Sequence, residues 1–403
     1  MRFDCRVGMT KEYQETVWAR GWADDDRTIC SGCVVDEALI EAILETAGSE
    51  PCDFCHEIPT SPTASAPIEV VLALVLDGLR YEYEDPNQGV AWDNGWQGAS
   101  VQDTGDLLWE LEITDREDVH HAIWNAIGQT EWCQRDPYAV TPTQALTWGW
   151  QEFSRFVKHR RRYTFFIEDE TPGSGAGELP VHKVLDAVAE AVEASGLVTT
   201  LPEGSEWWRA RVHDPGVSYT LAKDIGSPPA QIAKDNRMSP KGISVFYGAS
   251  SKAGAKDEVA GYAKSTDQAT IGCFTTTASV TVVDLRDPPF VPSLFSVDRH
   301  LRAARQFLRS FIADVTKVAV PSDVQNLDYV PSQIVAEYFS QGLDGTHGPV
   351  GGVIWRSSKD PAVTSCVLFI PNEEVADNGQ ETADTRLVLN PKSVMELAAP
   401  LAN

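Results

Sequence analysis

Apolar positions recur three and four residues apart in several stretches of the chain, which is the period of an α-helix with one buried face. Residues 298–315 show it most clearly, because Leu301, Phe307 and Phe311 share one helical face. Residues 182–195 repeat the pattern and are followed by Gly196, a typical residue after a helix end. The pattern predicts further helices at residues 36–47, 68–80, 118–127 and 143–157.

Runs of β-branched and aromatic residues, which favour strands, lie mostly in the second half of the chain. They predict strands at residues 208–212, 243–247, 279–283, 353–355 and 366–370. Helical and strand periods alternate there, so we predict an α+β fold for this part.

Two breaks in composition divide the sequence. Residues 57–67 are rich in Pro, Ser and Thr, and residues 168–180 are acidic and rich in Gly; neither composition favours a helix. We therefore predict a small module at 1–67, a mainly helical middle region at 68–170, a linker at 171–181 and a larger domain at 182–403.

The chain is strongly acidic, with 33 Lys and Arg against 59 Asp and Glu and a net charge of −26 over 403 residues. Such a charge repels phosphate backbones and anionic lipids, which argues against nucleic-acid and membrane partners. The longest apolar run, residues 70–76, is far shorter than the ~20 residues of a membrane span. We expect a soluble, cytoplasmic protein without a signal peptide, and a homo-oligomer.

Four cysteines form two CxxC pairs, Cys30 with Cys33 and Cys52 with Cys55, separated by eighteen residues. Four thiolates at this spacing suit tetrahedral Zn²⁺. The alternative is four reduced cysteines without a metal. A closed four-thiolate site leaves no open coordination position, so the zinc would be structural rather than catalytic.

Several polar residues in the second half of the chain are candidates for a ligand-binding site. Arg209 and Arg211 alternate on one face of a predicted strand, and this face either meets an anion or is solvated. Arg237 lies in a polar turn, Glu258 in a predicted helical segment, and Ser357 just after a strand. Taken singly, each is equally compatible with a surface charge or a turn hydroxyl.

The ordered set of motifs is more specific than any single one, and it resembles the RES-domain family over about residues 200–372. The motifs are WWRAR at 207–211, NRMSPKGI at 236–243, FYGA at 246–249, Glu258, YVPSQ at 329–333 and VIWRS at 353–357. The paired CxxC sequences, WCQRD at 132–136 and KHRRRY at 158–163 resemble the N-terminal domain found ahead of RES and HEPN domains.

This resemblance implies a fold related to the ADP-ribosyltransferase toxins and an activity on NAD⁺. RES proteins are toxins of toxin–antitoxin pairs that consume NAD⁺ by hydrolysis or phosphorolysis, or that transfer ADP-ribose to protein. The family's functional residues fall on Arg209, Arg237, Tyr247, Glu258 and Ser357. The chain departs from the family at two places: Gly254-Ala255 replaces the usual Thr-Ala before the Glu, and Trp355 stands where Tyr is commoner.

The chemistry of these residue types agrees with the resemblance. Cleavage of the nicotinamide–ribose bond passes through an oxocarbenium-like state, which the Glu258 carboxylate is suited to stabilise. Arg237 and Ser357 complete the predicted catalytic set, with Ser357 as a positioning hydroxyl because its motif contains no His or Lys base.

Substrate binding is assigned to Arg209, Arg211, Arg237, Tyr247 and Ser357. The guanidinium groups suit the pyrophosphate, and Tyr247 suits an aromatic ring of NAD⁺. The leading hypothesis is an NAD⁺-degrading toxin or antiviral defence effector, with an antitoxin or a defence protein as partner. The alternatives are a protein ADP-ribosyltransferase and a catalytically inactive NAD⁺-sensing module.

Overall fold

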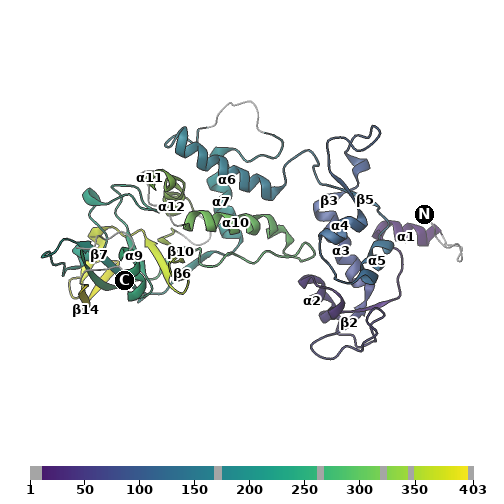
Figure 1. Ribbon diagram of the computed structural model, residues 1–403, viewed down its shortest axis with the longest axis horizontal. Coiled ribbons are helices and arrows are strands. Elements are labelled where there is room, and N and C mark those ends of the chain that lie inside the picture. The colour runs from purple at the N-terminus through teal and green to yellow at the C-terminus, as the bar shows by residue number, and fades with distance from the viewer. Residues whose placement is uncertain (1–10, 168–174, 261–266, 318–324, 344–348, 398–403) are drawn as a thin grey trace. The chain divides into compact units, whose positions relative to one another are not determined.

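The computed structural model describes residues 11–167, 175–260, 267–317, 325–343 and 349–397 (Figure 1). The chain forms two compact units. The N-terminal unit contains Met1–Val140 together with Val291–Arg302, and the C-terminal unit contains Thr141–Phe290 together with Ala303–Asn403. A short segment from the second half of the sequence therefore belongs to the N-terminal unit. The predicted linker at 171–181 lies partly outside the described residues.

In the described part of the N-terminal unit, from residue 11 on, there are five α-helices and two small sheets. Its helices are α1 (Lys11–Arg20), α2 (Glu37–Thr46), α3 (Ile68–Glu82), α4 (Thr104–Glu110) and α5 (Glu117–Ala126). Its strands are β1 (Thr28–Cys30), β2 (Ser65–Pro67), β3 (Tyr83–Glu84), β4 (Val101–Asp103) and β5 (Glu131–Gln134). β1 pairs with β2, and β5 lies between β3 and β4. Strand β2 occupies the end of the Pro/Ser/Thr-rich stretch, where no regular structure was predicted, because it pairs with the strand that carries Cys30.

The segment Val291–Arg302 contributes to the core of the N-terminal unit. Leu294 and Phe295 are each only 2% exposed there, and Phe295 packs so closely on α3 that a Cβ at Gly78 would lie 2.6 Å from its ring. Arg299 pairs with Asp77 at 2.5 Å. Burial of two large apolar side chains is worth several kcal/mol, at about 1.5–3 kcal/mol each, which explains why the segment leaves its sequence neighbours.

The described residues of the C-terminal unit form seven α-helices and one large sheet. The helices are α6 (Pro142–His159), α7 (Val184–Ala194), α8 (Ala222–Ile225), α9 (Lys252–Ala260), α10 (Arg302–Thr316), α11 (Gln325–Asp328) and α12 (Val330–Gly342). The strands are β6 (Val198–Leu201), β7 (Glu206–His213), β8 (Phe246–Ala249), β9 (Gln268–Thr276), β10 (Val280–Asp284), β11 (Gly352–Arg356), β12 (Thr364–Leu368), β13 (Val375–Asp377) and β14 (Leu387–Leu397). These elements confirm the predicted mixed α+β class.

The nine strands lie in the order β13-β14-β9-β7-β8-β12-β11-β10-β6. Among the strands that the structure describes, β10 with β11 and β13 with β14 are the parallel pairs, and the others pair antiparallel. Successive side chains of a strand point to opposite faces, and here they enter different cores. Val353 and Trp355 pack with the core formed by α6, α7, α10 and α12, whereas Ile354 joins the core on the other face. Figure 1 shows α6, α7 and α10 stacked beside one another.

None of the described helices is both long and apolar enough to cross a membrane.

Candidate functional site

Arg209 and Arg211 lie on β7 and use their guanidinium groups to hold neighbouring backbone. Arg209 donates to the carbonyl of Ile225 at 2.9 Å from Nε and to that of Tyr247 at 2.7 Å from Nη1. Arg211 donates to the Asp224 carbonyl, and its guanidinium lies over the Tyr219 ring. Two of the five N–H donors of Arg209 therefore anchor α8 and β8 to β7.

Side chains of helix α12 form hydrogen bonds to the turn that carries Arg237. The Ser332 hydroxyl donates to the Arg237 carbonyl at 2.7 Å. The Gln333 amide donates to the carboxylate of Asp235 and to the carbonyl of Asn236, at 2.9 and 2.8 Å. These contacts fix the backbone of the turn that carries Arg237.

The Arg237 guanidinium lies beside a small cavity of about 120 Å³. Its Nη1 donates to the Val315 carbonyl at the end of α10, at 3.3 Å. Trp150 and Lys158 of α6 also line this cavity. Burial lowers the pKa of Arg237, and the ionisable groups of Tyr329, Glu258 and Tyr247 act against that decrease. Arg237, Tyr247 and Glu258, which are separated in sequence, are thus electrostatic neighbours in the fold.

Both the backbone carbonyl and the phenolic oxygen of Tyr247 are held by hydrogen bonds. Its carbonyl accepts the bond from Arg209, and its phenolic oxygen accepts from the Met238 N–H at 3.1 Å and lies 3.1 Å from the Ser239 hydroxyl. Burial raises the pKa of Tyr247 to about 12, so the phenol is neutral at physiological pH. Tyr247 joins the Arg209 strand to the Arg237 turn.

Glu258 lies on α9 with an exposed side chain. Within the part of the chain that the structure describes, its carboxylate has no hydrogen bond or ion pair. Its backbone carbonyl accepts a hydrogen bond from Lys359 Nζ at 3.3 Å, and the carbonyl of Asp257 accepts from the same ammonium group. The carboxylate is therefore available to a ligand, while its helix is held by Lys359.

Ser357 is buried at the end of β11. Its hydroxyl oxygen accepts a hydrogen bond from the Lys359 N–H at 3.3 Å, and its own N–H donates to the Val363 carbonyl at 2.8 Å. Lys359 therefore links the Ser357 turn to the helix of Glu258. Such a hydroxyl shapes its own turn.

The structure brings Arg209, Tyr247, Arg237 and Glu258 into one neighbourhood, and Lys359 connects Ser357 to it. Arg211 points to α8 and Tyr219 instead. Sequence reasoning missed Ser332 and Gln333 as supports of the Arg237 turn, although the YVPSQ motif contains both. It also missed Lys359, which no pattern in the sequence distinguishes from other lysines.

One of the two departures from the family pattern has a steric reason. A Cβ on Gly254 would lie 2.4 Å from Cγ1 of Val363, so the space beside the helix is filled by valine. Trp355, the second departure, is buried in the core with α6, α7, α10 and α12.

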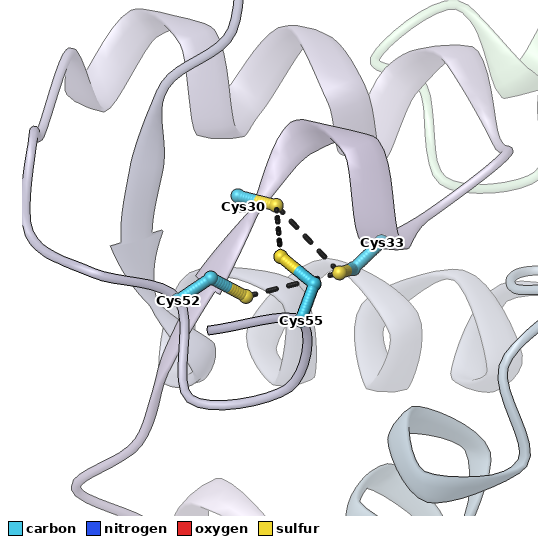
Figure 2. A group of neighbouring side chains, drawn as sticks. All are labelled: Cys30, Cys33, Cys52 and Cys55. Carbon is cyan, nitrogen blue, oxygen red and sulfur yellow. Dashed lines mark hydrogen bonds between the residues drawn. The ribbon is translucent and has the colours of Figure 1, made fainter. Parts of the chain in front are cut away.

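The four cysteines of the two CxxC pairs converge in the N-terminal unit, as Figure 2 shows. Sγ of Cys30 lies 3.6 Å from Sγ of Cys33 and 3.6 Å from Sγ of Cys55, and the Cys33 and Cys52 sulfurs are 3.7 Å apart. A tetrahedral zinc ion with Zn–S bonds of about 2.3 Å places its sulfurs about 3.8 Å apart. The residues present therefore fit such an ion.

Burial disfavours the thiolate form of these cysteines unless a positive charge lies nearby. It raises the pKa of Cys30 to about 11 and raises that of Cys33 as well. Against burial, the backbone N–H groups of Cys55 and Phe54 lower the pKa of Cys52. A bound cation would offset the charge of four clustered thiolates, three of them buried, which is the electrostatic reason for a metal here.

Family models match both parts of the chain. The HEPN/RES N-terminal domain 1 matches residues 45–171, and the RES domain matches residues 206–390. Residues 206–390, which include Arg237 and Glu258, are thus a RES domain. The HEPN/RES N-terminal domain 1 lies ahead of it in the chain.

Among solved structures, the chain is similar to one in the M. tuberculosis MbcT–MbcA toxin–antitoxin complex, with 13% sequence identity and a TM-score of 0.30. The match covers 53% of this chain and 93% of that chain. No curated protein shows significant similarity to the chain.

Proposed function

We propose that this protein cleaves the nicotinamide–ribose bond of NAD⁺, as a toxin or a defence effector. RES-domain toxins are generally enzymes that act on NAD⁺. Two observations support the proposal: the charge of Glu258 acts on the pKa of the buried Arg237 guanidinium, and the Glu258 carboxylate has no bond to other described residues. We propose that an anion-binding group, an aromatic ring and a free acid act on one ligand here.

Glu258 would stabilise the positive charge that develops on the ribose as nicotinamide departs. Arg237 would bind the pyrophosphate, and its partly buried position strengthens an ion pair with phosphate, because the local dielectric is low. Ser357 would orient the ribose from its turn. These roles, and those of Arg209, Arg211 and Tyr247 in binding the dinucleotide, are proposals.

The test is nicotinamide release from NAD⁺ by the purified full-length chain. We expect Glu258→Gln to abolish release while the melting temperature stays unchanged. Asp257→Asn is the matched control, because Asp257 is the exposed neighbour on the same helix, and it should retain activity. Normal turnover by Glu258→Gln would contradict the proposal.

The same assay distinguishes the possible acceptors of ADP-ribose. Release that needs inorganic phosphate and yields ADP-ribose-1″-phosphate identifies a phosphorylase, whereas free ADP-ribose identifies a glycohydrolase. Label transferred from NAD⁺ to protein identifies an ADP-ribosyltransferase. Tight NAD⁺ binding without any of these products would favour an NAD⁺ sensor over an enzyme.

We also propose that Cys30, Cys33, Cys52 and Cys55 bind one structural zinc ion. The sulfur distances and the burial of the thiols support it. Freshly purified chain should contain about one zinc per molecule. Cys52→Ser should lose the metal, and Cys133→Ser, which removes a buried thiol outside the cluster, should keep it. A metal content near zero in the wild type would refute the site.

A partner antitoxin, a homo-oligomeric state, a cytoplasmic location and a relation to the ADP-ribosyltransferase fold remain predictions. The antitoxin prediction rests on the RES family, since an unrestrained NAD⁺-consuming enzyme would poison its own cell. Light scattering of the purified chain measures the oligomeric state. Co-purification with the product of a neighbouring gene would identify the antitoxin.

A further inference from the structure

A second, larger cavity of about 820 Å³ lies on the C-terminal unit beside the turn that carries Arg237. It is formed by residues just after α6, by α12 and by the turn at 235–241. None of the predicted substrate-binding residues lines it. Its size is within the range of small-molecule sites, which are typically 300–1,000 Å³, about enough to enclose most of a ligand.

The walls of this cavity are aromatic. Tyr163, Phe165, Phe166 and Tyr338 line it, and Tyr163 and Phe166 remain 82% and 62% exposed. Phe165 packs edge-on against Phe153 of the core, and the Tyr338 hydroxyl donates to Asp186 at 2.6 Å, so both rings are held in place. Exposed aromatic rings beside a cavity suit a planar ligand that stacks on them.

Charged and polar side chains complete the lining: the cations of Arg162 and Lys241, the carboxylates of Asp235 and Glu337, and the amides of Gln333 and Gln341. Within the described parts of the chain, the side chains of Arg162 and Lys241 have no hydrogen bond or ion pair, and both line the cavity. Gln333, which is 7% exposed, uses its amide nitrogen for the Arg237 turn. Its Oε1 has no hydrogen-bond partner among the described residues and is left to accept from a ligand.

We propose that this cavity binds a nucleoside monophosphate. A nucleobase supplies the planar ring and an N–H donor for Gln333, and the phosphate pairs with Arg162 and Lys241. This is the smallest common ligand class that combines all three groups. Because Gln333 also holds Asp235 and Asn236, a ligand bonded to its Oε1 contacts the residue that positions Arg237. Through this contact the ligand would control NAD⁺ turnover. This regulatory part of the proposal rests on the proposed function, whereas the binding of the ligand does not.

Equilibrium dialysis of the full-length chain with AMP tests the binding. We expect AMP to bind at least about tenfold more tightly than adenosine or inorganic phosphate alone, since each of these satisfies part of the cavity. Phe166→Ala and the double variant Arg162→Ala/Lys241→Ala should each weaken AMP binding about tenfold. Phe290→Ala, which removes an equally exposed ring elsewhere in the same unit, should not. Undetectable AMP binding, or equal affinity in all variants, would overturn the proposal.

Photo-crosslinking with 8-azido-AMP locates the ligand. Label on peptides from 160–167 or 327–341 supports the cavity, whereas label confined to residues 246–258 would place AMP in the NAD⁺ site and overturn it. The dialysis and crosslinking need no turnover, so they stand even if the chain does not consume NAD⁺. If it does, AMP should change the rate of the wild type and not that of Phe166→Ala; an unchanged wild-type rate would refute the regulatory part.

Discussion

Ser293 donates a hydrogen bond from its hydroxyl to the carboxylate of Asp36, with 2.7 Å between Oγ and Oδ2. The two residues are 257 positions apart in sequence and belong to the same N-terminal unit. The other oxygen of Asp36 accepts from the N–H groups of Ala38 and Leu39 and caps α2, the helix between the two CxxC pairs. One carboxylate thus joins the cysteine module to the segment Val291–Arg302.

Asp36→Ala should therefore destabilise the N-terminal unit more than an ordinary cap substitution. It removes the helix cap and the bond to Ser293, for a loss of about 1.5–3 kcal/mol in the free energy of unfolding. Ser293→Ala should cost about 1 kcal/mol, and Glu41→Ala, an exposed change on the same helix, less than about 0.5 kcal/mol. Calorimetry of the full chain measures each effect; equal stability of Asp36→Ala and Glu41→Ala would show that the shared carboxylate contributes little.

Removal of the metal should destabilise the same unit. With a zinc chelator we expect the unfolding transition of the N-terminal unit to move to lower temperature, because four buried thiols lose the ion that joins them. The transition of the C-terminal unit should not move. Calorimetry before and after chelation, with zinc added back, checks this expectation. A first transition that is insensitive to chelation would argue against a structural ion.

Restoring a side chain at Gly254 should destabilise the C-terminal unit. Gly254→Ala gains up to about 1 kcal/mol of helix propensity, but overpacking against buried Val363 costs about 1–3 kcal/mol, so the clash wins. In a Val363→Ala background, where the clashing side chain is absent, Gly254→Ala should cost less stability than it does in the wild type. Urea unfolding measures the four proteins; if Gly254→Ala is stabilising, the helix can move away from Val363.

Lys359→Met should reduce NAD⁺ turnover, provided that the proposed function holds. The substitution removes the ammonium group that holds the carbonyls of Asp257 and Glu258, so the carboxylate loses its position relative to Ser357. We expect a fall in kcat of about tenfold, equivalent to about 1.4 kcal/mol. Lys252→Met, an exposed change at the start of α9, serves as control. Equal kcat in the two variants would leave Lys359 without a positioning role.

Glu82 should make the stability of the N-terminal unit depend on pH. Burial raises the pKa of Glu82, although Arg302 lies 3.5 Å from its carboxylate and opposes the shift. The folded chain therefore holds the Glu82 proton more tightly than the unfolded chain does. This contribution is fully present below the unfolded pKa of about 4.3 and is lost as the pH rises through the folded pKa.

Glu82→Gln, which is neutral at every pH, should consequently be more stable than the wild type at pH 7. The difference should vanish near pH 3–4, about where both forms are uncharged. Urea unfolding at the two pH values tests the sign. A variant that is less stable at pH 7 would mean that the ion pair with Arg302 outweighs the burial of the charge.

The kind of domain was readable from the sequence because its residues stand in ordered motifs. Their order predicted the RES domain, and the CxxC spacing predicted four converging cysteines. The motifs did not tell which arginines face a ligand. Arg209 and Arg211 share a strand face by simple alternation, yet both donate to backbone carbonyls, since those acceptors come from α8 and β8, which only the folded sheet places beside β7.

The sequence by itself determined the elements to within a few residues: the helices predicted at residues 68–80 and 298–315, the strand predicted at 279–283 and the cysteine pairs follow from periods and spacings that act within about ten residues. The tertiary structure decided which surfaces meet. Only there does Val291–Arg302 join the N-terminal unit, Gln333 support the Arg237 turn and Lys359 connect Ser357 to the helix of Glu258. These contacts depend on burying apolar faces from distant parts of the chain together, and no local pattern records which face will cover which.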